Sequence, residues 1–274
     1  MINNNKKKIL EVKNVSLSYS KKQIIDDVNL CIYEGETISI IGHNGCGKTT
    51  LGKILAFLIQ PDKGEFFFDN KKVSNNYDNL QKYIGFVFQN PDNQFFGSTV
   101  EDDIAFGLEN HLVQQDQMSK LINDVAKEIG ILDLLKKDVQ QLSGGQKQQV
   151  SIADILVLKP KVIIFDESFS MLDFSNKKKI FELIKTIKKK YKLTIIYITH
   201  DLEDTLDSDR VFLLEHGKIF LSGSPNYVFQ QSEKLQQINF ETPFIFQLNQ
   251  RLINKGIIKK VIFDIEQLVK IICK

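Results

Sequence analysis

The sequence predicts an α/β fold in which a parallel sheet carries a phosphate-binding loop. The apolar segment 37–41 runs directly into the glycine-rich stretch Gly42-His43-Asn44-Gly45-Cys46-Gly47-Lys48-Thr49. A second apolar segment, 162–165, ends in two carboxylates, Asp166 and Glu167. Strand-like and helix-like segments alternate around these motifs, which is the pattern of a parallel sheet covered by helices.

The first part of the chain reads as strands around one helix. Short apolar runs predict strands at 9–17, 24–32 and 37–41, the third feeding the glycine-rich stretch. Behind that stretch, four apolar residues fall on one helical face: Leu51, Ile54, Leu55 and Leu58. Pro61 and Gly64 are expected to end this helix. Two further strands are expected at 65–68 and 84–88.

The pattern becomes helical from about residue 98 to 159 and then returns to alternation. Residues 98–101 fit a capping box, with Glu101 reaching back to the first amides of a helix. Ser143 can cap a later helix that runs to Lys159 before Pro160. Strands at 162–165 and 194–199 with a helix at 180–190 follow. We therefore expect a helical subdomain, about 98–159, inserted into the α/β domain 1–228.

Strand signals stop after about residue 228, and we expect a small helical appendage at 229–274. Thr242-Pro243 opens a helix with proline at its first position, and Gly256 closes it. Asp264 can cap a second short helix. We expect this appendage to be a dimerisation element.

Composition narrows the class of protein. A net charge of +2 gives no global basic field, so nucleic acid is not the expected partner. Three scattered cysteines form neither a disulfide framework nor a metal cluster, which favours a reducing compartment. No apolar stretch has the roughly 20 residues of a membrane span. The polar, basic start of the chain does not resemble a secretion signal. If the protein works at a membrane, we expect it to dock on another chain there.

The glycine-rich stretch has the chemistry of a triphosphate site. Its glycines let backbone N–H groups surround phosphate oxygens, and the next helix directs its positive end at the same anion. Residues 42–50 are therefore the expected ATP-binding residues: Gly42, His43, Asn44, Gly45, Cys46, Gly47, Lys48, Thr49 and Thr50. Lys48 is expected on the β and γ phosphates and Thr49 on Mg²⁺. Because Cys46 lies at a helix start, a lowered thiol pKa and a reactive thiol are expected.

Asp166 and Glu167 lie at the carboxyl end of a strand, where parallel sheets bind ligands. Asp166 is expected to hold Mg²⁺ through water, and Glu167 to polarise the attacking water as general base. A third motif, Leu142-Ser143-Gly144-Gly145-Gln146, opens a helix whose free amides suit an anion. If the helical insert is a separate arm, this motif is too far from the phosphate loop of its own chain. A head-to-tail dimer resolves this, with Ser143, Gly144, Gly145 and Gln146 facing a partner's ATP.

The three motifs in this order resemble those of an ATP-binding cassette (ABC) ATPase over residues 9 to about 225, a P-loop NTPase fold. The resemblance implies that Tyr19 stacks on adenine and that Gln89 contacts Mg²⁺ and the attacking water. It also implies that Asp173 communicates across the dimer and that His200 touches the γ-phosphate. Two residues depart from the family pattern: Gln149 stands where arginine is common, and Asp154 where the residue is usually small or basic.

Residues 85–108 and the appendage are similar to the ATPases of energy-coupling factor (ECF) importers of vitamins and metals, most like the first of two paralogues. The resemblance implies a dimer with a second ATPase, a membrane coupling protein, a separate substrate-binding membrane subunit and a peripheral place on the cytoplasmic face of the membrane. Acids around aromatics could receive an arginine-bearing helix, or could simply cap a helix: Asp92, Glu101, Asp102 and Asp103 beside Phe95, Phe96 and Phe106. Homodimer and heterodimer both remain open.

Other functions fit the sequence less well. An ATPase of a different ABC importer or exporter is the main alternative. Chromosome-maintenance ATPases place hundreds of residues of coiled coil between the first two motifs, and this chain has no sustained heptads there. Ribosome-acting cassette proteins normally carry two cassettes in one chain. A small-molecule kinase would leave residues 142–146 unexplained.

Overall fold

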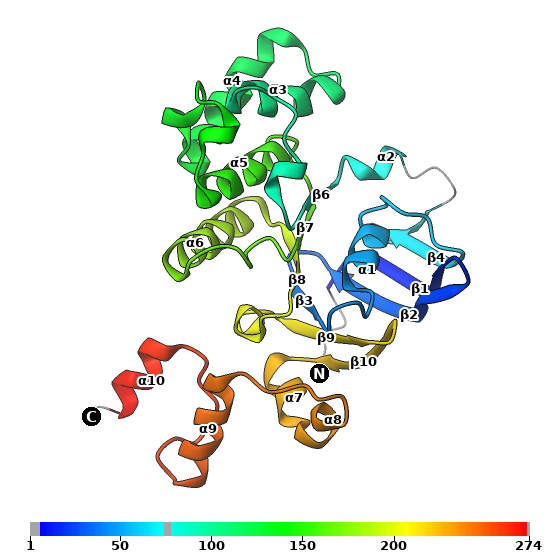
Figure 1. Cartoon of the computed structure of the whole chain (residues 1–274), viewed down its shortest axis with the longest axis vertical. Helices are drawn as coiled ribbons and strands as arrows, with labels where there is room; N and C mark the ends of the chain where they lie inside the picture. Colours follow the sequence, from blue (N-terminus) through cyan, green and yellow to red (C-terminus); the bar gives the residue numbers. More distant parts are fainter. Residues whose placement is uncertain (1–5, 74–77, 273–274) are drawn as a thin grey trace.

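The computed structural model describes residues 6–73 and 78–272, without the side chains of residues 78 and 79. Cys273 and the outer ends of the two expected domains therefore lie outside the described residues. Two sheets form the core of the fold (Figure 1). The smaller sheet has the strand order β2-β1-β4-β5 and pairs antiparallel throughout. Its strands are β1 (Lys8–Tyr19), β2 (Lys22–Tyr33), β4 (Lys63–Phe68) and β5 (Lys71–Lys72).

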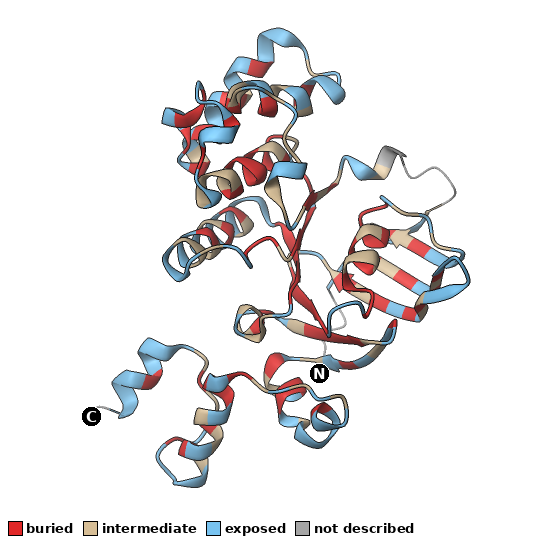
Figure 2. Ribbon diagram, viewed as in Figure 1, coloured by how far each residue is buried: buried red, intermediate tan, exposed pale blue. Residues whose placement is uncertain are grey.

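The larger sheet has the order β10-β9-β3-β8-β7-β6. Its strands are β3 (Thr37–Ile41), β6 (Ile84–Val87), β7 (Val162–Asp166), β8 (Thr194–Ile198), β9 (Arg210–Glu215) and β10 (Lys218–Gly223). All pairs are parallel except β9 with β10, which confirms the expected parallel sheet. Every residue of β3, β7 and β8 is buried, because both faces of the sheet are covered (Figure 2). Strands β9 and β10 were not predicted.

Alternate residues of the central strands face two different cores. Ile38, Ile164 and Ile196 pack with the antiparallel sheet and α1 (Lys48–Leu55). Ile163 and Ile195 pack with the helical subdomain and α6 (Phe174–Tyr191). Helix α1 ends at Leu55, before the expected Pro61, because the chain turns at Phe57 with a φ of 59°. Both cores thus meet at the strands that carry the phosphate loop and the paired carboxylates.

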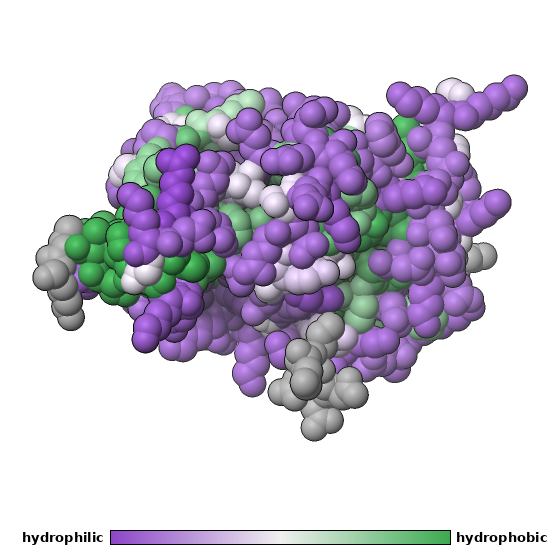
Figure 3. Space-filling model, turned by 90° about the horizontal axis from the view of Figure 1, so that it is seen from below, coloured by the Kyte–Doolittle hydropathy of each residue, from purple (hydrophilic) through white to green (hydrophobic). Residues whose placement is uncertain are grey.

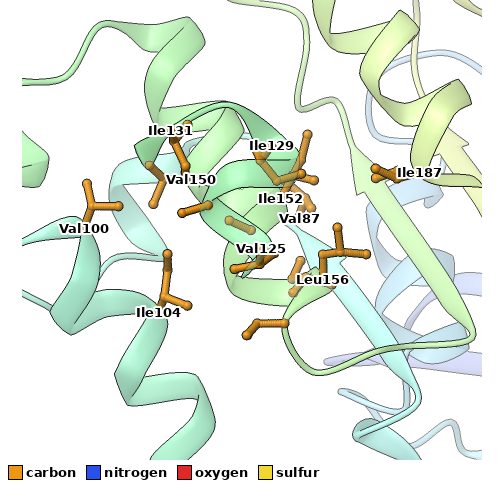
Figure 4. Packing of buried hydrophobic residues seen from close by; sticks show 14 of the residues in the cluster. Val87, Val100, Ile104, Val125, Ile129, Ile131, Val150, Ile152, Leu156 and Ile187 are labelled. Carbon is orange, nitrogen blue, oxygen red and sulfur yellow. The ribbon is translucent and has the colours of Figure 1, made fainter. Parts of the chain in front are cut away.

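The helical subdomain contains α3 (Val100–Asn110), α4 (Gln115–Ile129) and α5 (Gly144–Leu156), which share one apolar core (Figure 4). The capping box of α3 lies one residue later than expected. Thr99 caps the helix, and its partner is Asp102 rather than Glu101. Glu101 instead pairs with Lys136. The predicted pair of Ser98 and Glu101 was wrong by one residue. The hydroxyl that accepts the N–H of Asp102 belongs to Thr99, which follows Ser98.

The C-terminal part forms α7 (Pro225–Gln230), α8 (Ser232–Gln237), α9 (Phe244–Asn254) and α10 (Ile265–Ile272). Helices α7 and α8 lie below β9 and β10 in Figure 1, and their apolar residues share a core with those strands. Asn249 is buried and ties α9 to the segment before α10 through two hydrogen bonds with the backbone of Ile262. Asp264 caps α10, as expected, by accepting the N–H of Gln267. The boundary at 228/229 stays a prediction, since the core beneath β9 contains residues from both sides of it.

Short helices complete the described chain: α2 (Asp78–Gln81) and the 3-10 turns η1 (Pro91–Asn93), η2 (Leu132–Leu134), η3 (Val139–Gln141) and η4 (Leu202–Thr205). Across the described ranges, no helix is both long enough and apolar enough to cross a bilayer.

Candidate active site

The phosphate loop follows β3, and two of its glycines are required by close backbone contacts. Gly42 has a φ of +152°, and a Cβ there would lie 2.2 Å from the carbonyl oxygen of Leu214. Gly47 has a φ of +107°, and a Cβ there would lie 2.8 Å from the carbonyl oxygen of Ile24. The carbonyl groups of Leu214 and Ile24 therefore leave no space for a Cβ, and only glycine fits at these two positions.

Lys48 and Thr49 begin α1 and direct their side chains to the site. The Lys48 ammonium is buried, with 4% of the side chain exposed, and donates to the carbonyls of Gly42 and His43 at 2.9 and 3.1 Å. Thr49 Oγ1 donates to Asp166 Oδ1 at 2.9 Å. The loop thus presents one cation and one hydroxyl beside the carboxyl end of β7.

Asp166 and Glu167 terminate β7 in different environments. Burial raises the pKa of Asp166, and the hydrogen bond from Thr49 partly opposes that rise. Glu167 has a φ of 48°, which is uncommon for a residue with a side chain and costs about 1 kcal/mol or more. Its N–H bonds to the carbonyl of Ile198 on the adjacent strand and holds this turn. The turn separates the two carboxylates, so that Asp166 faces Thr49 while Glu167 faces other groups.

Three polar side chains converge on the Glu167 carboxylate. Lys48 Nζ lies 3.6 Å from its Oε1. His200 Nδ1 lies 3.2 Å from its Oε2, and Gln89 Nε2 donates to the same oxygen at 3.4 Å. A cavity of about 200 Å³ adjoins Glu167 and His200 and is also lined by Ser170 and Thr199. The structure therefore brings together Lys48, Thr49, Gln89, Asp166, Glu167 and His200, which come from four separate segments of the chain.

The donor set suits Mg²⁺ only in company with phosphate. Among the described residues, no three His, Cys, Asp or Glu side chains converge as ligands for a metal ion. A hydroxyl and a carboxylate 2.9 Å apart are nevertheless the oxygen donors that Mg²⁺ takes when phosphates and waters supply its other ligands. Thr49 and Asp166 fit this role. The amide of Gln89 points to Glu167, so a part in holding the metal stays a prediction.

The Ser-Gly-Gly motif lies in the helical subdomain and begins α5. Ser143 caps the helix through a reciprocal pair with Gln146, in which each side chain accepts the other's backbone N–H. A Cβ on Gly145 would lie 3.3 Å from Asn176, and one on Gly144 would lie 3.9 Å from Leu172. These neighbours belong to the segment after β7 rather than to the phosphate loop. Ser143 and Gly144 are exposed, so this helix end is open to a further molecule.

Comparison with known proteins identifies the family. Residues 25–170 match the family model described as "ABC transporter". The chain belongs to the ABC transporter family.

Its ABC relatives include several with the same printed name. The chain is 42% identical over 269 residues to the "energy-coupling factor transporter ATP-binding protein EcfA1" of Mycoplasma mobile, covering 97% of each chain. It is 41% identical to the protein of that name from Mycoplasma pneumoniae, covering 100% of this chain and 98% of the relative. A solved structure of cbiO1 from Clostridium perfringens, described as part of the ABC transporter complex cbiONQ, superposes with a TM-score of 0.77 at 35% identity. That match covers 89% of this chain and 99% of cbiO1.

The roles of the remaining residues that the resemblance implies stay predictions. Tyr19 is exposed at the end of β1, and Asn44, Gly45 and Thr50 lie on or beside the phosphate loop. Asp173 caps α6, and hydrogen bonds from the backbone N–H and side chain of Asn176 hold the pKa of its carboxyl below the usual range.

The prediction for Cys46 was wrong. Burial raises the pKa of the Cys46 thiol, and the nearby Lys48 ammonium only partly opposes this. The thiol is enclosed, since it would lie 2.7 Å from a Cβ on Gly42. The helix start therefore does not make this cysteine reactive.

Sequence reasoning missed Lys177, one turn into α6 after Asp173. Its ammonium lies 2.6 Å from both Asp201 Oδ2 and Asp204 Oδ1. Burial lowers the pKa of Lys177, but the two carboxylates outweigh burial and the pKa is raised. Because Asp201 directly follows His200, Lys177 connects the helix capped by Asp173 with the histidine segment. The signal in the sequence was a lysine four residues after Asp173.

The structure bears on both alternatives for the acidic residues near the aromatics, docking of a partner helix or capping of their own helix. Phe96 and Phe106 are exposed and stack at 5.0 Å between ring centroids, while Phe95 packs against the core. Asp103 is buried and accepts the N–H groups of Phe96 and Gly97. Asp102 closes the capping box, and Glu101 and Asp92 pair with lysines. Asp103 therefore shapes the loop below Phe96, so of the two alternatives the docking role is wrong for this residue, and its role lies within its own chain.

Proposed function

We propose that this chain is the ATP-hydrolysing subunit of an energy-coupling factor transporter that powers uptake of a vitamin or metal-type micronutrient. The observation that carries the proposal is the convergence of Lys48, His200 and Gln89 on the Glu167 carboxylate, beside the Thr49–Asp166 pair. The names of the relatives support the transporter type. The alternative is the ATPase of another ABC importer or exporter.

The residues of the site have two kinds of role, binding of ATP and activation of the attacking water. Lys48 and the amides of residues 42–49 bind the phosphates of ATP, and Tyr19 stacks on adenine. Thr49 and Asp166, with Gln89, would hold Mg²⁺, which supplies charge neutralisation for the phosphates when bound. Glu167 accepts the proton of water as the water attacks the γ-phosphorus in line. His200 holds the Glu167 carboxylate and contacts the γ-phosphate, so the base stays aimed at the reacting water.

The open start of α5 serves a second ATP. The start of this helix consists of Ser143, Gly144, Gly145 and Gln146. Ser143 and Gly144 are exposed, and the first amides of a helix favour an anion. In a head-to-tail dimer with a second ABC ATPase, either a copy or a paralogue, this helix end completes the partner's site. Asp173 lies on the segment next to it and is placed to communicate between the two sites.

The C-terminal helices supply a second surface for that dimer. Residues 229–274 end in α10, whose side chains Ile265, Val269 and Ile272 are exposed. Figure 3 shows a hydrophobic group at one edge of the molecule, next to hydrophilic surface. Burial of apolar area of this kind stabilises association by about 25 cal/mol per Å² before binding costs. We assign the appendage to dimerisation.

The stacked pair Phe96 and Phe106 is the surface proposed for the membrane coupling protein. Both rings are exposed and lie on the loop and helix that follow Gln89, so a helix seated there can act on the catalytic glutamine. A separate membrane subunit binds the transported substrate. This chain then sits peripherally on the cytoplasmic face of the membrane.

The test is affinity purification of the full-length chain, tagged, from membranes of its own cells in mild detergent. We expect a second ABC ATPase and at least two membrane proteins to copurify, with ATP hydrolysis by the complex. A purified chain with ATP hydrolysis and exporter-type membrane partners would favour the alternative. A complex without ATP hydrolysis, or a chain without membrane partners, would contradict the proposal.

A further inference from the structure

The phosphate loop is in contact with the C-terminal part of the chain. His43, the second residue of the loop, has its Nε2 2.7 Å from the carbonyl oxygen of Ile238. Its ring meets the ring of Phe240 edge-on, with centroids 5.3 Å apart and planes at 76°. Nε2 donates this hydrogen bond, because a carbonyl can only accept. Two residues of the segment 238–240 therefore hold one side chain of the ATP-binding loop from 195 positions away.

The strand that leads into the loop rests on the same region. Ile41, the last residue of β3, is fully buried in a core that also contains Phe229, Leu235 and Phe246. Ile238 and Phe240 pack on the edge of that core. Residues after 228 thus contact the loop directly through His43 and contribute to the core that holds Ile41, together with residues of β9 and β10.

A second contact joins the C-terminal helices to the other side of the ATP site. Leu206, six residues after His200, packs against the core that contains Ile245 of α9. The C-terminal helices therefore contact both the phosphate loop, through His43, and the segment that follows His200.

We propose that Phe240 and the Ile238 carbonyl position the phosphate loop through His43, so that ATP binding and packing of the C-terminal helices are coupled. This rests on the proposed ATP-binding role of residues 42–50. A loop held in its binding conformation loses less conformational entropy when it takes up phosphate, so its affinity is higher than that of an unsupported loop. Coupling between two sites is reciprocal, so bound nucleotide steadies α8 and the segment to α9 in return.

The test uses the full-length purified chain, with Mg²⁺ and a non-hydrolysable ATP analogue as the probe. Phe240→Ala removes the ring on which His43 rests, and His43→Ala removes both contacts. His43→Gln keeps a donor for the Ile238 carbonyl. The matched control is Phe244→Ala, which deletes the same side chain from an exposed position in the same region. Analogue affinity is measured by calorimetry, and hydrogen exchange of residues 232–246 is measured with and without the analogue.

In the wild type, we expect the analogue to slow exchange at 232–246. Phe240→Ala and His43→Ala should bind the analogue about fivefold or more weakly and lose that slowing, within the usual range of coupling between sites. His43→Gln should fall between His43→Ala and the wild type, and Phe244→Ala should match the wild type. Turnover of Phe240→Ala at saturating ATP should be unchanged, because the catalytic groups are untouched.

The outcomes separate the two proposals. A wild-type chain that binds no analogue contradicts the proposed function itself. Wild-type binding together with wild-type affinity and slowing in Phe240→Ala and His43→Ala overturns the positioning role. If Phe240→Ala fails to fold, the two His43 variants decide, and equal affinity of His43→Gln and His43→Ala would then count against the hydrogen bond.

Discussion

The two parts of the proposed ATP site are built in opposite ways: a phosphate half, residues 42–49 with 166–167, and a signature half, residues 143–146. In the phosphate half, side chains from separate segments are bonded to one another: Lys48 lies 3.6 Å from Glu167, and Thr49 bonds to Asp166. In the signature half, the side chains of Ser143 and Gln146 accept each other's backbone N–H groups within one helix turn. The phosphate half is therefore fixed by its own chain, whereas the signature half is an exposed helix end.

The difference teaches where each half acts. Groups that move protons or hold a metal ion must be placed within fractions of an ångström, which demands the support that Glu167 receives from His200, Gln89 and the Ile198 carbonyl. A helix end that contributes N–H groups to a partner's ligand needs only a fixed cap and free space. Changes to the two halves should accordingly produce different kinetic losses.

The largest effect is expected from Glu167→Gln. Glutamine keeps the size of the side chain but cannot accept a proton from water, so turnover should fall by about 100-fold or more. ATP affinity should be kept, because Lys48 and the loop amides are unchanged. Steady-state hydrolysis and analogue binding measure the two quantities. Glu182→Gln, an exposed carboxylate on α6, is the control and should behave as wild type. Normal turnover in Glu167→Gln would remove Glu167 as the base.

A matched pair of changes separates the halves. Lys48→Ala should abolish measurable ATP binding, since it removes the cation within the loop. Ser143→Arg should leave the affinity of the purified chain for ATP unchanged and lower turnover of the assembled complex by about tenfold or more, because it obstructs the helix end that the partner's ATP needs. Calorimetry on the chain and hydrolysis by the complex provide the readouts. Weakened ATP binding in Ser143→Arg would place the two halves around the same nucleotide of one chain.

Lys177 connects the two halves. It lies on α6, which adjoins the signature half, and it pairs with Asp201 and Asp204 in the segment that follows His200. Lys177→Met should lower the maximal rate by about three- to tenfold with little change in KM, because His200 loses its support while the ATP contacts remain. Lys177→Arg should recover most of the rate, since a guanidinium can pair with Asp201 and Asp204. An equal loss in both variants would indicate a packing role.

The last prediction concerns stability rather than catalytic rate, at Asp154 on α5. Burial, together with the neighbouring Asp103, raises the pKa of its carboxyl well above the usual range. The folded state then binds this proton more tightly than the unfolded chain, so its stabilising effect is complete below about pH 4 and is lost as pH rises through the folded pKa. Asp154→Asn should raise the free energy of unfolding at neutral pH by about 1–3 kcal/mol.

Denaturant unfolding of wild type and Asp154→Asn from pH 4 to pH 8 measures this difference. The gain should shrink toward pH 4, where both side chains are neutral. Asp124→Asn, an exposed site on α4, is the control and should show no such trend. A gain that grows as pH falls would contradict the assignment.

The sequence was sufficient where one local pattern determines the structure. The continuous apolar runs predicted β3, β7 and β8, because strands buried on both faces carry no polar alternation. The helical subdomain and the cap at Ser143 also followed from local patterns. Strands β9 and β10 were missed although each has six residues; in the fold, β9 pairs with β3 and β10 pairs with β9. The separate antiparallel sheet likewise depends on contacts between distant segments.

The same distinction, between local patterns and contacts of distant segments, applies to the candidate site. Local motifs predicted Lys48, Thr49, Asp166 and Glu167, the family resemblance implied His200, and the structure brings them together. The errors concern burial, which no local pattern reveals: Cys46 is enclosed behind Gly42, and Asp103 faces inward to hold the backbone of Phe96 and Gly97. Lys177 and the contact of His43 with Phe240 were missed because each joins residues whose proximity depends on the folded arrangement.

The most direct test of the central claim, that the two halves serve different ATP molecules, is photo-crosslinking from position 143. A photoreactive amino acid replaces Ser143 in the full-length chain, and the membrane complex is irradiated with and without Mg²⁺ and ATP analogue. We predict an analogue-dependent crosslink to the phosphate-loop peptide of a second ATPase chain, whether a copy or a paralogue. A crosslink to residues 42–49 of the same chain, or analogue-independent crosslinking without a second ATPase, would contradict it.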